Sequence, residues 1–322
     1  MNYLYMKILI TGSCGFIGKH ISEKLLNEGH HIIGIDNHNS YIYDNKFKKK
    51  NSECLKIYEN YTEIQDDIMN HDYIKENNPD VIIHLAAYAN VRKSFEDPDK
   101  YIRNNVECTC KILKEITHCK KQPLLIYASS SSIYGTNTKI PFTESDETDN
   151  IISPYAISKK MCEDVVNLFC KTNGLTAVGL RFFTVYGPGG RPDMAIYNFL
   201  KNIKENKPIT LFGDGSMKRD FTFVSDIAEG IFKCIELKIK MGEHRIYNIG
   251  NNNPVSLVSL IETCEKIVGK KAIIIKSNIP NGDVPITYAN IEKAQKDLNY
   301  NPTTNINDGI KIMYDWLKEL NF

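Results

Sequence analysis

The sequence predicts a doubly wound α/β fold, in which helices cover both faces of a parallel sheet. Five apolar runs rich in β-branched residues occur in the first 190 residues, and they show no polar alternation, as is typical of strands buried on both faces. These runs span 6–12, 30–36, 80–87, 123–130 and 176–183. Helical patterns separate the strands, and the first of them, FIGKHISEKLLNEG, ends at Gly29, a natural helix stop. Repeated strand–helix–strand units indicate a Rossmann-like domain.

The composition of the sequence changes after Pro188, where glycine and proline become frequent and the expected strands and helices become shorter. We therefore expect two domains, a dinucleotide-binding domain over 1–187 and a smaller α/β substrate-binding lobe over 188–322. Residues near 219–236 are expected to pack back on the first domain. The lobe should face the carboxyl ends of the strands, where ligands of such folds bind.

Composition excludes some classes of partner. Forty Lys and Arg residues against 39 Asp and Glu leave a net charge of +1, so neither a nucleic-acid partner nor a membrane partner is predicted. The basic run 46-KFKKK-50 is interpreted as a solvated helix face. Nine cysteines without a CxxC pair predict reduced thiols, no metal site and a cytoplasmic location. We expect neither a signal peptide nor a transmembrane helix.

A glycine-rich turn follows the first strand. In 11-TGSCGFIG-18, Gly12, Gly15 and Gly18 let the backbone turn tightly and approach a pyrophosphate at the start of a helix. Asp36 ends the second strand, and a carboxylate at that place accepts hydrogen bonds from ribose hydroxyls and repels a 2′-phosphate. The pattern predicts dinucleotide binding, with NAD favoured over NADP.

A second pattern lies in 153-SPYAISKK-160. Tyr155 and Lys159 are one helical turn apart, so both project from the same side of a helix. A phenol can act as a base near neutral pH only where positive charge stabilises its phenolate, and a neighbouring ammonium provides such charge. The pair therefore predicts a Tyr–Lys acid–base centre.

These motifs together resemble the extended short-chain dehydrogenase/reductases that act on nucleotide sugars, because the loop spacing is GxxGxxG. The segments 85-LAAYANVRKSFEDP-98, 181-RFFTVYGPGGRPDMAIYNF-199, 219-RDFTFVSDIAEGI-231 and 282-GDVPITYA-289 are similar to those of the UDP-glucuronate 4-epimerases. The resemblance implies tightly bound NAD that is regenerated at each turnover. It implies further cofactor contacts from Phe16, Ile17, Asn37, Asp67, Ile68, Leu85, Ala86, Ala87, Asn105 and Phe182, beside Tyr155 and Lys159.

The stretch 127-YASSSSIYG-135 carries the clue to the reaction. By the resemblance, Ser130 is the catalytic hydroxyl that polarises the reacting oxygen, while Ser129 ends the strand and should face the cofactor. The next two positions hold acids in the family's 4,6-dehydratases, and the decarboxylases keep the glutamate. Here they are Ser131 and Ser132. The resemblance therefore implies plain 4-epimerisation through a transient 4-keto sugar.

The expected substrate is UDP-glucuronate, converted to UDP-galacturonate. A diphosphate and a carboxylate both call for guanidinium groups, which bind them bidentately. Arg219 resembles the diphosphate ligand, and Arg191 and Arg92 are candidates for the sugar carboxylate. The remaining substrate contacts expected by resemblance are Ser94, Ser130, Ser131, Ser132, Thr184 and Asp283.

Other functions remain open at this stage. One is a 4-epimerase of UDP-glucose or UDP-N-acetylglucosamine, and less favoured ones are a UDP-glucuronate decarboxylase and a nucleotide-sugar 4,6-dehydratase. A non-catalytic NAD-sensing protein on the same fold is a further alternative, although such a protein would not need the Tyr–Lys pair. The resemblance also implies a homodimer, in which helices near 100–118 and 155–172 of two chains form a four-helix bundle.

Overall fold

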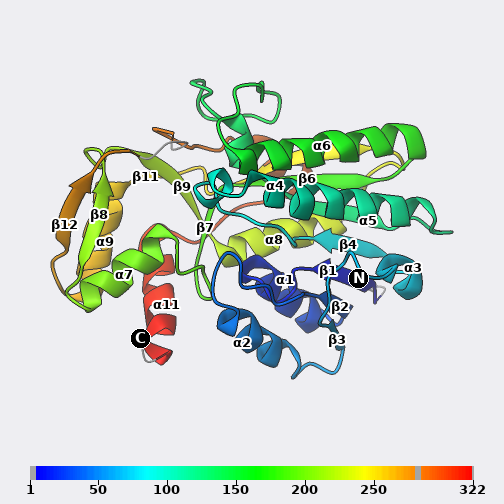
Figure 1. Cartoon of the computed structure of the whole chain (residues 1–322), viewed down its shortest axis with the longest axis horizontal. Coiled ribbons are helices and arrows are strands. Elements are labelled where there is room, and N and C mark those ends of the chain that lie inside the picture. The colour runs from blue at the N-terminus through cyan, green and yellow to red at the C-terminus, as the bar shows by residue number, and fades with distance from the viewer. Residues whose placement is uncertain (1–4, 280–283, 321–322) are drawn as a thin grey trace.

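A computed structural model describes residues 5–279 and 284–320 of the 322-residue chain. Its centre is a seven-stranded parallel sheet with the strand order β10-β6-β5-β4-β1-β2-β3 (Figure 1). The strands are β1 (Lys7–Thr11), β2 (His31–Ile35), β3 (Tyr61–Ile64), β4 (Val81–His84), β5 (Leu124–Ser130), β6 (Ala177–Phe182) and β10 (His244–Ile249). The predicted parallel sheet is confirmed, and all five predicted strands are present, while β3 and β10 were not predicted.

Helices cover both faces of this sheet. One face carries α1 (Phe16–Asn27) packed against α8 (Val224–Ile235), and the other carries α5 (Cys108–Thr117) packed against α6 (Pro154–Asn173). Successive side chains of a strand point to opposite faces. In β1, Ile8 and Ile10 therefore join the core beside α1, whereas Leu9 joins the core beside α5. This two-sided burial explains the unbroken apolar runs in the sequence.

Shorter helices complete these two layers. They are α2 (Lys46–Leu55), α3 (Tyr73–Asn77), η1 (Lys93–Phe95), α4 (Pro98–Tyr101), the π-helical η2 (Ile102–Glu107), η3 (Ser131–Tyr134) and α10 (Glu292–Leu298). Both α8 and β10 follow Pro188 in the sequence, yet they belong to the layers of the large sheet. In the described ranges, no helix is long and apolar enough to cross a membrane.

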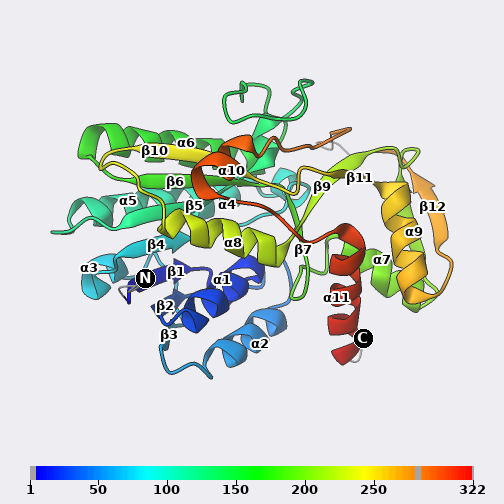
Figure 2. The ribbon, with the colours of Figure 1, turned by 180° about the vertical axis from the view of Figure 1, so that it is seen from behind.

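The remaining elements form a lobe with its own core beside the carboxyl ends of the large sheet (Figure 2). Its strands are β7 (Thr184–Tyr186), β8 (Pro208–Phe212), β9 (Lys218–Phe223), β11 (Pro254–Ser256) and β12 (Ile273–Ser277). They pair as β11-β9-β7 and β12-β8. The helices α7 (Ala195–Lys204), α9 (Leu257–Val268) and α11 (Ile306–Glu319) pack around Leu200, Leu260 and Ile310, which are fully buried.

The strand order of the large sheet reverses at β1. The chain runs outward from β1 to β2 and β3, and it then returns to place β4 on the other side of β1. Loops that leave the carboxyl ends of β1 and β4 diverge in opposite directions, which leaves a crevice between them where ligands of this fold class bind.

Candidate active site

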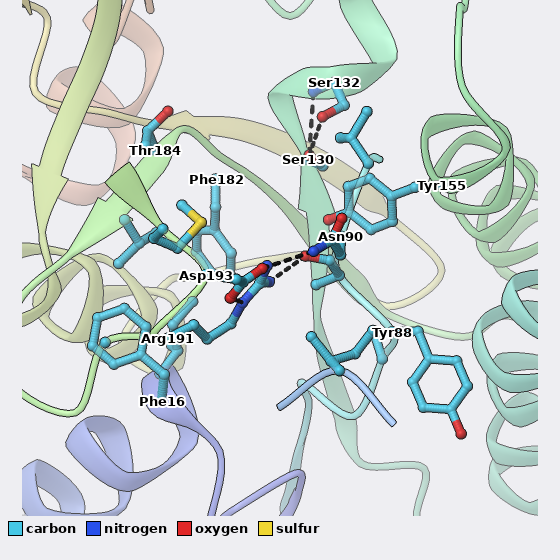
Figure 3. Close-up of a pocket in the computed structure, with 18 of the residues that line it drawn as sticks. Phe16, Tyr88, Asn90, Ser130, Ser132, Tyr155, Phe182, Thr184, Arg191 and Asp193 are labelled. Atoms are coloured by element: carbon cyan, nitrogen blue, oxygen red, sulfur yellow. Dashed lines mark hydrogen bonds and ion pairs between the residues drawn. The ribbon is translucent and has the colours of Figure 1, made fainter. Parts of the chain in front are cut away.

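A cavity of about 850 Å³ lies at the carboxyl ends of the strands, between the large sheet and the lobe. Its walls include the glycine turn after β1, the ends of β4 and β5, the start of α6 and parts of the lobe from β7 to β9 (Figure 3). This volume is in the range of pockets that hold large organic ligands.

The glycine turn lies at the base of the cavity, where Gly12, Gly15, Phe16, Ile17 and Gly18 all form part of its lining. Gly12 has a φ of +72°, and a Cβ there would lie 2.9 Å from the backbone nitrogen of Ala86. A Cβ on Gly18 would lie 2.0 Å from the carbonyl oxygen of Gly12. The turn therefore needs glycine at both places, and it presents backbone N–H groups at the start of α1, where anions bind.

Asp36 follows β2 and reaches the cavity wall. Its Oδ1 accepts hydrogen bonds from the His38 backbone at 2.8 Å and from Lys48 Nζ at 3.2 Å. Its buried Oδ2 has no hydrogen-bond partner among the described residues. An unpartnered buried carboxylate oxygen is costly, and a ribose hydroxyl is a group that could satisfy it. Lys48 comes from the run 46–50, so the interpretation of that run as a wholly solvated face was wrong for Lys48.

The other residues expected near the cofactor divide into two groups. Asn37, Asp67, Ile68, Leu85, Ala86, Ala87 and Phe182 line the cavity. Asn105 does not belong to the cavity's described lining. It is buried within η2, where its amide bonds to both backbone groups of Tyr88 and to Ser158. Asn105 thus holds the cavity wall at Tyr88 from behind.

The Tyr155 and Lys159 side chains both line the cavity from the first turns of α6. Ser153 caps the helix by accepting a hydrogen bond from the Ala156 backbone, which fixes the first turn. Lys159 Nζ donates to the carbonyl oxygen of Ala128 at 2.9 Å, so its ammonium is held at the end of β5. Both side chains are at most 9% exposed, so the ammonium acts in a largely water-free environment.

A buried histidine lies beneath this pair. His84 Nδ1 is 2.7 Å from Thr11 Oγ1, and its Nε2 is 3.3 Å from Thr109 Oγ1. Burial, together with the charge of Lys159, lowers the pKa of His84 to about 3. His84 is therefore neutral at ordinary pH and adds no second positive charge near Lys159.

The four serines point to different partners. Ser129 lines the cavity as expected, and its hydroxyl donates to Glu163 Oε1 at 2.5 Å. Ser130 Oγ accepts from the Ser132 backbone at 3.2 Å and lies 3.1 Å from Ser132 Oγ. Ser130, Ser131 and Ser132 all line the cavity, and no carboxylic acid stands at these positions. Figure 3 shows the bonded Ser130 and Ser132 at one side of the cavity.

Arg191 enters the cavity from the segment after β7 and binds Asp193. Its Nε and Nη2 donate to the two carboxylate oxygens at 2.9 and 2.6 Å, and Asn90 donates to the same carboxylate at 2.7 Å (Figure 3). Arg191 also donates to the carbonyl oxygen of Ala89. Burial opposes ionisation of Asp193, but the bonds and charge of Arg191 outweigh it and lower the pKa of the carboxyl group. The guanidinium is thus held in one place and is not a loose surface cation.

The other expected substrate residues are distributed as follows. Arg92, Thr184 and Arg219 line the cavity, and the Arg92 guanidinium lies 4.6 Å from the centre of the Phe212 ring. Ser94 is fully buried and donates to the Val91 carbonyl oxygen, so its hydroxyl supports the η1 turn and is not part of the described lining. Asp283 lies outside the described residues.

Sequence reasoning missed four residues that shape the site, namely Lys48, Asn90, Glu163 and Asp193. The arginine–proline–aspartate order at 191–193 is a local signal, because residues two apart across a proline turn can meet. The other three lie far in sequence from their partners, and only the folded chain brings them together. Their partners are Asp36, Asp193 and Arg181.

Comparison with known proteins shows to which family the chain belongs. Residues 8–250 match the model of the NAD dependent epimerase/dehydratase family. An uncharacterized protein of Methanocaldococcus jannaschii is 43% identical over 98% of this chain and 97% of its own length. UDP-glucuronate 4-epimerase 2 of Arabidopsis thaliana is 36% identical over 97% of this chain and 75% of its own.

A solved structure is similar over nearly the whole chain. The crystal structure of UDP-glucuronic acid 4-epimerase from Bacillus cereus, in complex with UDP-glucuronic acid and NAD, superimposes with a TM-score of 0.92. It is 35% identical in sequence, and the match covers 98% of this chain and 100% of that one. The matched family region contains the glycine turn, the serine run and the Tyr155–Lys159 pair. The chain belongs to the NAD dependent epimerase/dehydratase family.

Proposed function

We propose that this protein is an NAD-dependent 4-epimerase of UDP-sugars, and that UDP-glucuronate and UDP-galacturonate are its substrate and product. The observation that carries the proposal is the content of one cavity. It combines a dinucleotide turn, a Tyr–Lys helix and a half-buried arginine, and it has serines where related dehydratases and decarboxylases carry acids. The relatives named above as UDP-glucuronate 4-epimerases support the same assignment.

The cavity residues fit NAD. The glycine turn would hold the pyrophosphate, and the unpartnered Oδ2 of Asp36 would accept from the adenosine ribose. Asp67 and Ile68 would flank the adenine, and Lys159 would hold the nicotinamide ribose. Bound there, NAD would supply the hydride-transfer chemistry by which C4 of the sugar is oxidised and then reduced again on the opposite face of the ring.

The protein's own groups move the proton and hold the sugar. Tyr155 removes the proton of the 4-hydroxyl group and later returns it, while the fixed ammonium of Lys159 favours the phenolate. Ser130 turns its hydroxyl from Ser132 to the reacting oxygen, and the Ser132 backbone N–H keeps Ser130 in place. The 4-keto sugar turns about its phosphate linkage between the two hydride transfers.

The sugar carboxylate distinguishes glucuronate from neutral hexoses. Arg191 supplies the guanidinium for it, and Ser131, Ser132 and Thr184 supply hydroxyl donors. A 4-keto uronate is a β-keto acid that can lose CO₂. Hydroxyl groups at 131 and 132 hold the carboxylate without offering an acid to the neighbouring carbons. Arg219 would bind the diphosphate from β9, with Arg92 as a second cation near the sugar.

Product analysis tests this proposal. Purified protein is given UDP-glucuronate, UDP-glucose and UDP-N-acetylglucosamine side by side, and the products are identified by NMR and mass spectrometry. We expect UDP-galacturonate of unchanged mass as the main product. Preference for a neutral hexose would overturn the substrate assignment, and loss of CO₂ or water would overturn simple epimerisation. No turnover, together with no reduction of bound NAD by any sugar, would favour a non-catalytic NAD-binding protein.

We also propose that two chains pair through α6 and the helix formed by α4, η2 and α5. Ile157, Met161 and Leu168 follow one another along one face of α6 and are 43%, 38% and 54% exposed. Exposed apolar stripes of this kind are typical of interfaces. Sedimentation of the wild type and of Leu168→Glu should give a dimer and a monomer, and a wild-type monomer would refute the pairing.

All nine cysteines, each within the described ranges, are free, which supports the expected cytoplasmic location.

A further inference from the structure

A second group of reactive side chains lies outside the cavity, beneath the glycine turn. Cys14 lies within the turn, His38 follows β2 and Glu63 belongs to β3. The thiol, one ring nitrogen and one carboxylate oxygen of these residues all lie within 4.8 Å of one another. None of the three belongs to the described lining of the cavity. The proposed reaction therefore leaves this cluster without a role.

The distances within the cluster are close to those of a metal centre. His38 Nε2 lies 3.0 Å from Glu63 Oε1, and Cys14 Sγ lies 3.9 Å from the same oxygen. Ligand atoms around tetrahedral zinc are separated by roughly 3.3–3.8 Å, which follows from bonds of 2.0–2.3 Å. The third pair, Cys14 Sγ and the His38 nitrogen, lies within 4.8 Å. A movement of up to about 1 Å would therefore bring the three atoms to bonding positions around one ion.

His38 provides an independent sign that a ligand is missing. The residue is 7% exposed, and its Nε2 faces Glu63 Oε1 at 3.0 Å, whereas its Nδ1 has no hydrogen-bond partner among the described residues. A buried imidazole nitrogen without a partner, such as this Nδ1, is costly. The left-handed backbone of His38, with a φ of 50°, is held by a bond from its N–H to Asp36.

The surrounding groups orient the three side chains. Glu63 Oε2 is bound by Ser52 Oγ and, at 3.0 Å, by Lys56 Nζ, so Oε1 is left to face His38 and Cys14. Asn51 donates to the Cys14 carbonyl oxygen at 3.0 Å and fixes that peptide. Partners of this kind, which orient ligands without touching the ion, are a regular feature of metal sites.

We propose that Cys14, His38 and Glu63 form a zinc-binding site that ties the glycine turn to the ends of β2 and β3. A thiolate, a neutral imidazole and a carboxylate balance the charge of a divalent ion, and this mixed set of sulfur, nitrogen and oxygen donors suits zinc. A water molecule would complete four-coordination. The expectation of a metal-free chain rested on cysteine spacing, which cannot detect ligands from three separate segments.

Protonation of the thiol sets the condition for binding. Burial, with the charges of Asp36 and Glu63, raises the pKa of Cys14 to about 12. The ion must therefore displace the thiol proton, so zinc binding should release a proton and weaken as the pH falls.

Titration of the metal alone into full-length, chelator-treated protein tests the proposal. We expect one zinc ion per chain by calorimetry, and Co²⁺ should give the charge-transfer absorption of a cobalt–thiolate bond. Cys14→Ala and His38→Asn should each weaken zinc binding by about 100-fold or more, because even removal of an orienting partner costs 10–100-fold. Asparagine tolerates the backbone of residue 38.

The matched control is Cys264→Ala, because Cys264 is equally buried but lies in the other core. It should bind zinc as the wild type does. Zinc should raise the thermal midpoint of unfolding of the wild type and of Cys264→Ala, but not that of Cys14→Ala or His38→Asn. Circular dichroism establishes whether each variant is folded. If Cys14→Ala does not fold, the zinc affinity of His38→Asn alone is compared with that of the wild type. Equal zinc affinity in the wild type and the folded ligand variants would overturn the proposal, as would the absence of a cobalt–thiolate band.

Discussion

The buried ion pair behind the serine run gives the sharpest prediction. Glu163 and Arg181 are 3% and 4% exposed, and Arg181 donates to the two carboxylate oxygens at 3.0 and 2.9 Å. Glu163→Gln keeps the shape but removes the negative charge and one of the two acceptors. Breaking one partner of a buried pair costs about 3–5 kcal/mol, because the other charge stays buried. We expect that loss in the free energy of unfolding.

Chemical denaturation followed by far-ultraviolet circular dichroism measures this loss. The control is Glu229→Gln, which breaks the pair of Lys24 with a glutamate whose side chain is 38% exposed. Exposed pairs contribute at most about 1 kcal/mol. The double variant Glu163→Leu/Arg181→Met should lose less than Glu163→Gln, because no unpaired charge remains. A loss for Glu163→Gln as small as that of the surface control would refute the reasoning.

Four further outcomes are expected. Tyr155→Phe should lower kcat by about 10²–10⁴-fold and leave NAD binding intact by calorimetry; a smaller effect would mean that another group is the base. Arg191→Met should lower kcat/KM for UDP-glucuronate by about 10–100-fold, because hydrogen bonds to charged groups contribute about 1.5–3 kcal/mol. The same variant should leave kcat/KM for UDP-glucose unchanged, and an equal effect on both sugars would contradict a carboxylate-binding role. Gly18→Ala should weaken NAD binding, because its Cβ would lie 2.0 Å from the Gly12 carbonyl oxygen; unchanged affinity would show that the turn can shift. For His84, the folded-state pKa of about 3 lies below the ordinary 6.5, so the unfolded chain takes up the proton first and stability falls as pH drops below about 6.5. This amounts to about 2 kcal/mol at pH 5, and His84→Asn should remove that part of the pH dependence in denaturation curves; an unchanged pH dependence would refute it.

Local patterns in the sequence were enough to predict much of the fold. An apolar run that needs burial on both sides can only be a central strand, so β1, β2, β4, β5 and β6 were all predicted. β10 was not predicted, because HRIYNI has polar residues at its start and lies in the part of the sequence, after Pro188, that was assigned to the lobe. Its place beside β6 depends on pairing with a strand some 70 residues earlier in the sequence.

In the site, too, local features could be predicted from the sequence, whereas contacts between distant segments could not. The glycine turn and the Tyr155–Lys159 pair could be predicted, because a turn and a helical repeat fix their geometry within a few residues. The partner of each charged group could not be predicted in this way. Arg191 binds Asp193 and Asn90, and Ser129 faces Glu163, because the fold closes over them.

The sequence by itself determined the fold class, the cofactor turn, the acid–base helix and the family. The tertiary structure alone decided which hydroxyl faces which acid, that Lys48 meets Asp36, and that Cys14, His38 and Glu63 converge. The physical reason is distance along the chain. Backbone conformation and periodicity act over a few residues and leave a mark in the sequence, whereas contacts between segments depend on how whole layers pack.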